Sequence, residues 1–128
     1  MADVWLQINR GENVTLDLGT VDSALIPTGS LSRIDVSGNV GGGDTVIVSA
    51  QDVERLGAMD LVVNAQTGVG HIQMLINGDA NDTVQLVGGQ GQWADGGTTQ
   101  VGGQSYQILN HDNLQLLVGV RVQCNEAL

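Results

Sequence analysis

Apolar and polar residues alternate along most of the chain. A period of two places successive side chains on opposite faces of an extended backbone, so this alternation predicts β-strands rather than helices. Turn residues such as Gly, Asn and Asp separate the alternating runs. The predicted strands are residues 4–8, 14–18, 33–36, 45–48, 61–63, 71–76, 83–87, 100–101, 105–109 and 114–118, with residues 119–123 as a further candidate.

The alternation is interrupted between residues 49 and 57 by a pattern that predicts one short helix. Ser49 is suited to cap the first turn, with Asp52 three residues later, and Val53 and Leu56 fall on one helical face. Gly57 follows as a residue that can end the helix.

A strand-loop-strand pattern recurs along the sequence. Residues 34–48 are echoed by residues 75–86, and their DTV triplets begin at Asp44 and Asp82, 38 residues apart. A weaker third copy, residues 6–16, has Asn13 where the other two have Asp. Repeated units of one design predict stacked coils or repeated hairpins.

Length and composition support a single all-β domain spanning residues 1–128. The chain is 41% hydrophobic but only 2% aromatic, so its core must consist mainly of Val, Leu and Ile. Nineteen glycines favour tight turns over helix interiors. We therefore expect stacked strand-loop-strand units, either a β-sandwich or a β-solenoid-like fold, with one helix near residues 50–56.

The charge balance narrows the functional classes. Fourteen Asp and Glu residues oppose four arginines, there is no lysine, and the net charge is −10. Nucleic acid is excluded as a partner, because phosphate binding depends on clustered basic residues. Such a chain would gain stability from bound cations. The composition favours an extracellular or bacterial cell-surface protein.

Export and redox features are few. Cys124 is the only cysteine, so neither an intrachain disulfide nor a cysteine zinc cluster is expected. The first residues lack the basic and apolar regions of a signal peptide. No run approaches the roughly 18 apolar residues of a membrane span.

Two acidic loops are candidates for calcium ligation. Ca²⁺ takes oxygens from carboxylates, amide carbonyls and the backbone. The alternative is that these side chains bond their own backbone in turns, in which case Asp82→Asn should cost little. The candidate ligands are Asp35, Asn39 and Asp44 in the first loop, and Asn77, Asp79, Asn81 and Asp82 in the second.

The second loop resembles the calcium-binding nonapeptide GGxGxDxUx of repeats-in-toxin (RTX) proteins. It keeps Gly78, Asp82 and Val84 but has Asn77 and Ala80 at glycine positions. The order of motifs over residues 30–122, which includes GQWADGGT and VGGQSYQI, is similar to a module of large bacterial RTX-type adhesins. Residues 1–29 lie outside this resemblance. It implies a secreted, calcium-dependent surface protein with a structural role, whose partners are neighbouring modules or identical subunits.

Other candidate sites are weaker. Trp93, with Asp95 beside it, would suit a surface glycan if its ring were exposed, but a Trp packed over a neighbouring strand is more common. His71 and His111 are expected to be spectators. Asp79 and Asp82 lack the aromatic platforms and the desolvation expected of a glycosidase acid pair. We therefore expect a non-enzymatic structural or adhesive module. The alternative is a glycan- or calcium-dependent ligand-binding domain.

Overall fold

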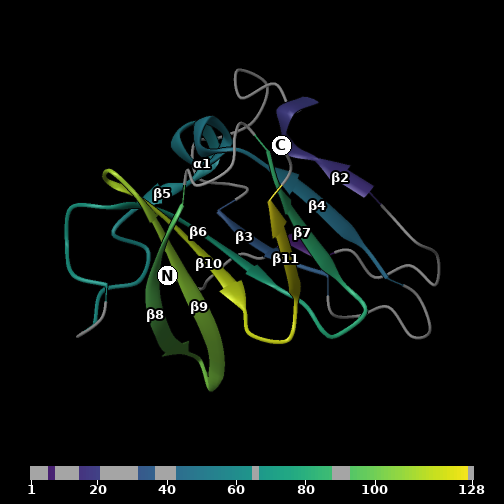
Figure 1. The fold of residues 1–128 in the computed structure, drawn as a ribbon. Helices are drawn as coiled ribbons and strands as arrows, with labels where there is room; N and C mark the ends of the chain where they lie inside the picture. Colours follow the sequence, from purple (N-terminus) through teal and green to yellow (C-terminus); the bar gives the residue numbers. More distant parts are fainter. Residues whose placement is uncertain are drawn as a thin grey trace.

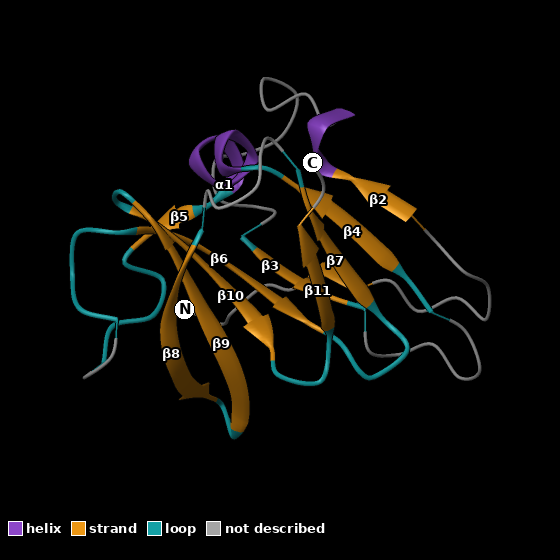
Figure 2. Ribbon diagram, viewed as in Figure 1, coloured by secondary structure: helices purple, strands orange, loops and turns teal. Residues whose placement is uncertain are grey.

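The computed structural model describes residues 6–7, 15–20, 32–36, 43–64, 67–87 and 93–126. Most regular structure in these residues is β-strand, which confirms the all-β prediction, and one α-helix interrupts it (Figure 2). No helix among them is long and apolar enough to cross a membrane. The elements are β1 (Leu6–Gln7), β2 (Thr15–Asp17), the 3₁₀ helix η1 (Leu18–Thr20), β3 (Arg33–Asp35), β4 (Thr45–Val48), α1 (Ala50–Leu56), β5 (Ala58–Met59), β6 (Ile72–Asn77), β7 (Thr83–Leu86), β8 (Ala94–Val101), β9 (Gln104–His111), β10 (Leu114–Gly119) and β11 (Gln123–Glu126).

The strands form two sheets, and the chain passes repeatedly from one to the other. Sheet A has the order β1-β3-β6-β10-β9-β8, with β5 paired to β6, and sheet B has the order β11-β7-β4-β2. The strands β1, β3, β6 and β10 run parallel, as do β2, β4, β7 and β11. Each pair β1/β2, β3/β4, β6/β7 and β10/β11 thus makes one coil, and in the described part of the chain these coils stack in sequence order (Figure 1). The arrangement matches the expected stacked units.

The main core lies between the two sheets. Ile34, Ile76 and Val118 form one row across sheet A, and Val46 and Val84 form a row in sheet B. All five belong to one apolar cluster and are at most 1% exposed. Burying each such side chain stabilises the fold by about 1.5–3 kcal/mol. The aliphatic composition therefore suffices for the core, because each coil contributes one residue to the same row.

The sequence echo corresponds to a structural repeat. Thr45 pairs with Thr83 and Val46 with Val84, so the two DTV triplets lie side by side. The third copy, in the first coil, pairs one residue away from the alignment that its sequence predicts, because Leu16, and not Thr15, lies opposite Val46. Matching apolar side chains across the sheet decides the register, since a slip of one residue would turn each side chain to the opposite face.

The helix forms as its local signals predict. The Ser49 hydroxyl accepts a bond from the Asp52 backbone N–H, and the Asp52 carboxylate accepts one from the Ser49 N–H. The Gly57 N–H donates to the Val53 oxygen and closes the last turn. Val53 and Leu56 are buried in the main core. The helix therefore covers the core at one end of the strands, against β6 and β10 (Figure 1).

The segment after β5 covers the outer face of sheet A without forming the strand predicted at residues 61–63. Val62 is buried there in a second apolar cluster with Leu75 and Tyr106. The Gln73 side chain substitutes for a partner strand: its Oε1 accepts from the Val62 N–H at 2.6 Å, and its Nε2 donates to the Val62 oxygen at 2.8 Å. The same Nε2 donates to Gln115 Oε1 at 2.8 Å. Residues 61–63 are therefore apolar because Val62 is buried, and the Gln73 side chain, rather than a partner strand, bonds its backbone.

Three other predicted strands need correction or lie partly outside the described residues. Residues 119–123 are not one strand, because β10 ends at Gly119 and the Val122 N–H donates to the Gly119 oxygen in a turn before β11. Of the N-terminal predicted strands, 4–8 and 14–18, the structure describes only residues 6–7 and 15–18.

The close contact between successive coils predicts a severe effect of Gly43→Ala. A Cβ at this position would overlap the backbone oxygen of Asn81 in the next coil. We expect a loss of about 3 kcal/mol in the free energy of unfolding, at the upper end of overpacking costs, measured by urea denaturation.

Gly68→Ala is the matched control. Gly68 has a φ of 63° but no atom within 4 Å of an added Cβ, so only its left-handed conformation is penalised, by about 1 kcal/mol. Equal losses in the two variants would contradict close packing at Gly43.

Candidate functional site

The second acidic loop carries the chain from sheet A to sheet B. It follows Asn77 at the end of β6 and reaches Thr83 at the start of β7. Asp44 holds the same place before β4 as Asp82 holds before β7, because Thr45 pairs with Thr83. The candidate calcium residues of this loop therefore lie where one coil turns over against the next.

The Asp82 carboxylate connects two coils through backbone amides. Its Oδ1 accepts from the Asp44 N–H at 2.9 Å, and its Oδ2 accepts from the Asp79 N–H at 2.8 Å. The side chain of Asp82 is fully buried at 0% exposure. Oδ1 thus satisfies a buried backbone donor, which would otherwise cost about 1–3 kcal/mol, and Oδ2 satisfies a partly buried one.

The same aspartates also take part in the backbone bonds of sheet B. The Thr83 N–H donates to the Asp44 oxygen at 2.8 Å, and the Gln123 N–H donates to the Asp82 oxygen at 3.0 Å. Asp44 is itself 1% exposed. Asp82 therefore touches the second, third and fourth coils at once and fixes their register.

Asp79 and Asn81 form a local turn. The Asn81 N–H donates to Asp79 Oδ1 at 3.0 Å, and the Asp82 N–H donates to the Asp79 backbone oxygen at 3.1 Å. Side chains that bond the backbone two residues on are typical of Asx turns. Asn81 is exposed, and Asp79 is half-buried.

The structure brings together residues of the two acidic loops. Asp35 pairs with Asn77 across β3 and β6, and Asn77 Nδ2 donates to Asp35 Oδ1 at 3.4 Å. Asp44 meets Asp82 as described above. Asn39, the remaining candidate of the first loop, lies outside the described residues.

These contacts do not fit a calcium ion at Asp82. Calcium requires six to eight oxygens, whereas each Asp82 oxygen already faces a backbone N–H. Among the residues that the structure describes, no three His, Cys, Asp or Glu side chains are grouped as metal ligands would be. The geometry favours the turn interpretation of this loop, and calcium binding by the chain stays a prediction.

The protonation of Asp82 reflects its buried position. Burial raises the pKa of its carboxyl above the ordinary value, and the nearby Asp79 carboxylate adds to this rise. The bonds from the Asp44 and Asp79 amides oppose the rise by favouring the ionised form.

Trp93 does not present the exposed ring that glycan stacking requires. It is 6% exposed and lies in the main core, with its ring centroid 5.8 Å from that of His111. Asp95 is exposed, and its Oδ1 accepts from the Gly97 N–H at 2.9 Å within the bulge of β8. Trp93 therefore packs over a neighbouring strand, and a ligand role for Asp95 stays a prediction.

The histidines lie near one end of sheet A. His71 precedes β6, and His111 ends β9, with its Nε2 3.7 Å from Asp112 Oδ2. Asp112 is 88% exposed, so this contact is strongly screened by solvent. His71 and the acidic loop lie at opposite ends of β6. That the two histidines are spectators stays a prediction.

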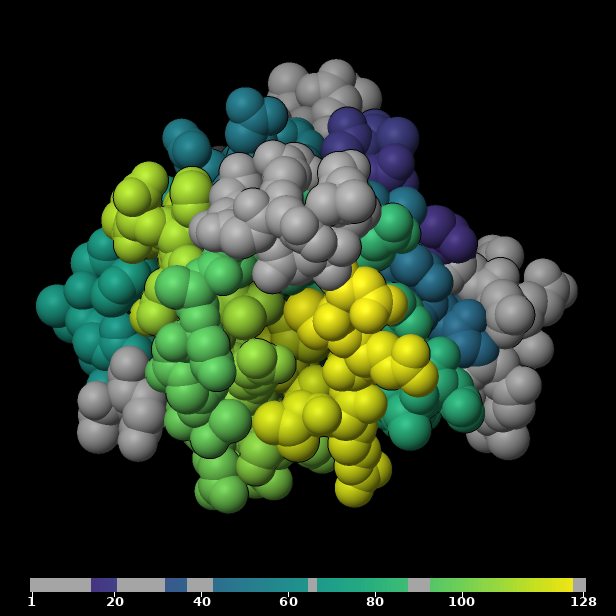
Figure 3. Space-filling view, in the orientation of Figure 1, coloured from purple at the N-terminus to yellow at the C-terminus, as the bar shows by residue number. Residues whose placement is uncertain are grey.

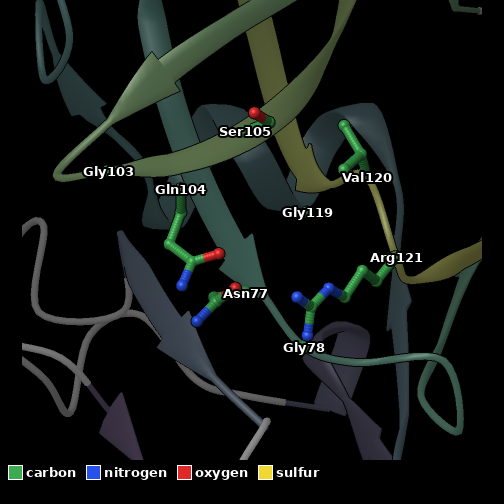
Figure 4. A pocket seen from close by; sticks show the side chains of 8 residues that line it. All are labelled: Asn77, Gly78, Gly103, Gln104, Ser105, Gly119, Val120 and Arg121. Atoms are coloured by element: carbon green, nitrogen blue, oxygen red, sulfur yellow. The ribbon is translucent and has the colours of Figure 1, made fainter.

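A polar cavity that the sequence did not indicate lies at the other end of the β8–β9 hairpin. It has a volume of about 200 Å³, and Asn77, Gln104, Ser105 and Arg121 contribute polar side chains to it (Figure 4). These residues come from three separate segments. No local motif could have identified them, because only the parallel pairing of β6 with β10 and the return of β9 bring them together.

The two backbone bonds at Asp82 predict that Asp82→Asn destabilises the protein even in the presence of a chelator. An amide group has only one acceptor oxygen, so its NH₂ must face one of two N–H donors. We expect a loss of about 1–3 kcal/mol in the free energy of unfolding, measured by urea denaturation. This differs from the small cost expected of a purely local turn.

Asp79→Asn is the control, because its remaining oxygen can still accept from Asn81 and little stability should be lost. Unchanged stability of Asp82→Asn in chelator, together with loss of a calcium-specific rise in melting temperature, would instead identify Asp82 as a ligand.

The raised pKa of Asp82 predicts a pH dependence of the stability difference between wild type and Asp82→Asn. The folded state retains the proton to higher pH than the unfolded state. Wild-type stability relative to the variant should therefore fall as pH rises from the ordinary Asp value, about 3.9, through the raised folded-state pKa. Urea denaturation of both proteins across this range checks the sign, and a difference that grows with pH would contradict it.

Comparisons of the chain with protein-family models, with curated proteins and with solved structures found no match. The contacts of the described residues are therefore the basis for the function proposed next.

Proposed function

We propose that the chain is a non-enzymatic structural module of a bacterial extracellular or cell-surface protein, and that it associates with identical subunits or neighbouring modules through the edge strand β2. The observation that carries the proposal is the unequal termination of the stack. At one end of the stack an antiparallel hairpin extends sheet A beyond its last parallel strand, whereas at the other end the described strands stop at β1 in sheet A and at β2 in sheet B. The resemblance to RTX-type adhesin modules favours the same kind of role.

The hairpin β8–β9 serves as a cap. It pairs with β10, and Val118 of that strand is only 1% exposed. A bulge between Asp95 and Thr98, with Gly97 at a φ of 89°, makes the outer strand irregular. Bulges of this kind discourage a further strand from pairing.

The opposite end is less protected. Leu16 on β2 is half-buried, whereas Val46 and Val84 in the same row are fully buried at 0% exposure. Thr15 beside it is exposed. Among the described residues β2 has a partner strand on one side only. A strand from a neighbour would cover Leu16 and continue the same parallel arrangement.

Charge sets the conditions for this association. Each copy carries a net charge of −10, so two copies repel one another at low ionic strength. Salt screens this repulsion. Association through backbone pairing should therefore strengthen as salt is added, which is opposite to the behaviour of an interface formed by salt bridges.

Thr15→Pro tests the edge directly. In a parallel ladder, the backbone groups of successive residues point alternately to the two neighbouring strands. The Thr83 N–H donates to the Asp44 oxygen, so the backbone groups of Thr45 face β2 rather than β7. Thr15 lies opposite Thr45, and its own N–H therefore points away from β4. Proline removes this donor without removing a bond to β4. We expect salt-promoted self-association of the wild type in sedimentation velocity, weakened about fivefold by the variant, since one hydrogen bond contributes about 1 kcal/mol.

Gln100→Pro is the matched control. Gln100 lies on β8 next to the turn pair Val101 and Gln104, so its N–H faces the outer edge of sheet A. This variant should associate like the wild type. Loss of association in Gln100→Pro but not in Thr15→Pro would place the interface at the hairpin, and a wild type that stays monomeric at all salt and protein concentrations would reject self-association.

A further inference from the structure

The polar cavity beside Arg121 lies at one end of sheet A, where β6 and β10 end and β9 begins. Asn77 ends β6 and is followed by Gly78, Gly119 ends β10 and is followed by Val120 and Arg121, and Gln104 and Ser105 begin β9 after the turn at Gly103. Figure 4 shows the side chains of Asn77, Gln104 and Arg121 extending into a common space from these segments. On the molecular surface the hairpin and the C-terminal residues adjoin on one face (Figure 3).

The fold holds Arg121 in place through its turn. The Val122 N–H donates to the Gly119 oxygen at 2.9 Å, and the Val120 N–H donates to the Ser105 oxygen at 3.1 Å. Val122 is 7% exposed and anchors the turn in the core, close to Gly78. The backbone of Arg121 is thus held on both sides, although its side chain is exposed.

The opposite wall depends on a tight turn. Gly102 and Gly103 have φ values of 60° and 85°, as a two-residue hairpin turn between β8 and β9 requires. Gly103 contributes no side chain to the cavity, which leaves room beside Gln104. An added Cβ at Gly119 would lie 3.4 Å from Asn77 Oδ1, so a larger residue at this position would also reduce the cavity.

Arg121 differs from Arg55 in its partners. Arg55 donates to the Asp52 carboxylate and to the Leu18 oxygen, both at 2.9 Å. Arg121 makes no ion pair or hydrogen bond with any residue in the described ranges. The Arg121 guanidinium is therefore directed into a cavity whose lining contains no carboxylate.

We propose that this cavity binds a carboxylate on a small, hydroxyl-rich molecule, such as a sugar acid. The planar guanidinium presents two parallel donors that match a carboxylate. One positive charge balances one carboxylate, whereas a doubly charged phosphate would be repelled by the overall charge of −10. This assignment does not depend on association through β2.

The remaining lining matches hydroxyl groups. Asn77, Gln104 and Ser105 offer both donors and acceptors. No aromatic ring lines the cavity, and its volume of about 200 Å³ suits a single small ring. Asp35 is the nearest strand neighbour of Asn77, but its Oδ1 accepts from Asn77 Nδ2, so Asn77 lies between this carboxylate and the ligand.

Amide NMR titration with galacturonate tests the proposal, with galactose, acetate and inorganic phosphate as comparison probes. Galacturonate should shift the amides of Gln104, Ser105, Val120 and Arg121 saturably. Galactose lacks the carboxylate and acetate lacks the hydroxyls, so each should bind at least about tenfold more weakly, a difference of about 1.4 kcal/mol. Phosphate should bind no more tightly than acetate.

Two variants with the same net charge distinguish binding in the cavity from a general effect of charge on ligand binding. Arg121→Gln should weaken galacturonate binding about tenfold or more, with amide shifts elsewhere unchanged. Gln51→Glu has the same net charge as Arg121→Gln but lies on α1, at the opposite end of the strands, and should bind like the wild type. The proposal is wrong if galacturonate gives no saturable shifts, if acetate or phosphate binds as tightly, or if both variants lose binding equally.

Discussion

The bond between the Asp82 carboxylate and the Asp44 amide is the constraint on which the stack depends. Parallel strands cannot be joined by a tight hairpin, so no turn fixes their register directly. Here the aspartate that ends one crossing accepts from the amide that ends the previous one, 38 residues earlier. The same carboxylate holds its own loop through the Asp79 amide. One side chain therefore sets both the shape of the crossing and its alignment with the neighbouring coil.

A similar solution occurs on the outer face of sheet A. The segment containing Val62 passes over the sheet without pairing as a strand, and its backbone groups still need partners away from water. Gln73 supplies a donor and an acceptor to Val62 and is itself bonded to Gln115. At both places a buried polar side chain substitutes for the missing backbone of a partner strand. Loss of either would leave backbone groups unsatisfied inside the protein, which costs more than the loss of a surface contact.

The parts predicted correctly from sequence are those determined locally or by repetition. Ser49 and Asp52 form the predicted capping box, and the DTV triplets at Asp44 and Asp82 pair in register. The prediction at residues 61–63 was wrong because an apolar run does not distinguish a strand from a segment bonded by a distant glutamine. The alignment of the first coil was wrong because opposing apolar residues, here Leu16 and Val46, decide the register. The cavity at Arg121 was not predictable, since its lining residues meet only after β6, β9 and β10 have paired.

The turn that holds Arg121 also delivers the last strand to sheet B. Its Val122 anchors in the core, and the next residue, Gln123, donates its N–H to the Asp82 oxygen. The turn thus connects the cavity to the aspartate that aligns the coils. A ligand held between Arg121 and Gln104 would add a further connection between this turn and the capping hairpin, beside the bond from Val120 to Ser105 and the pairing of Gly119 with Tyr106. Because a ligand that binds only the folded arrangement stabilises it, occupancy of the cavity would stabilise the hairpin end of the stack, which lies opposite β2.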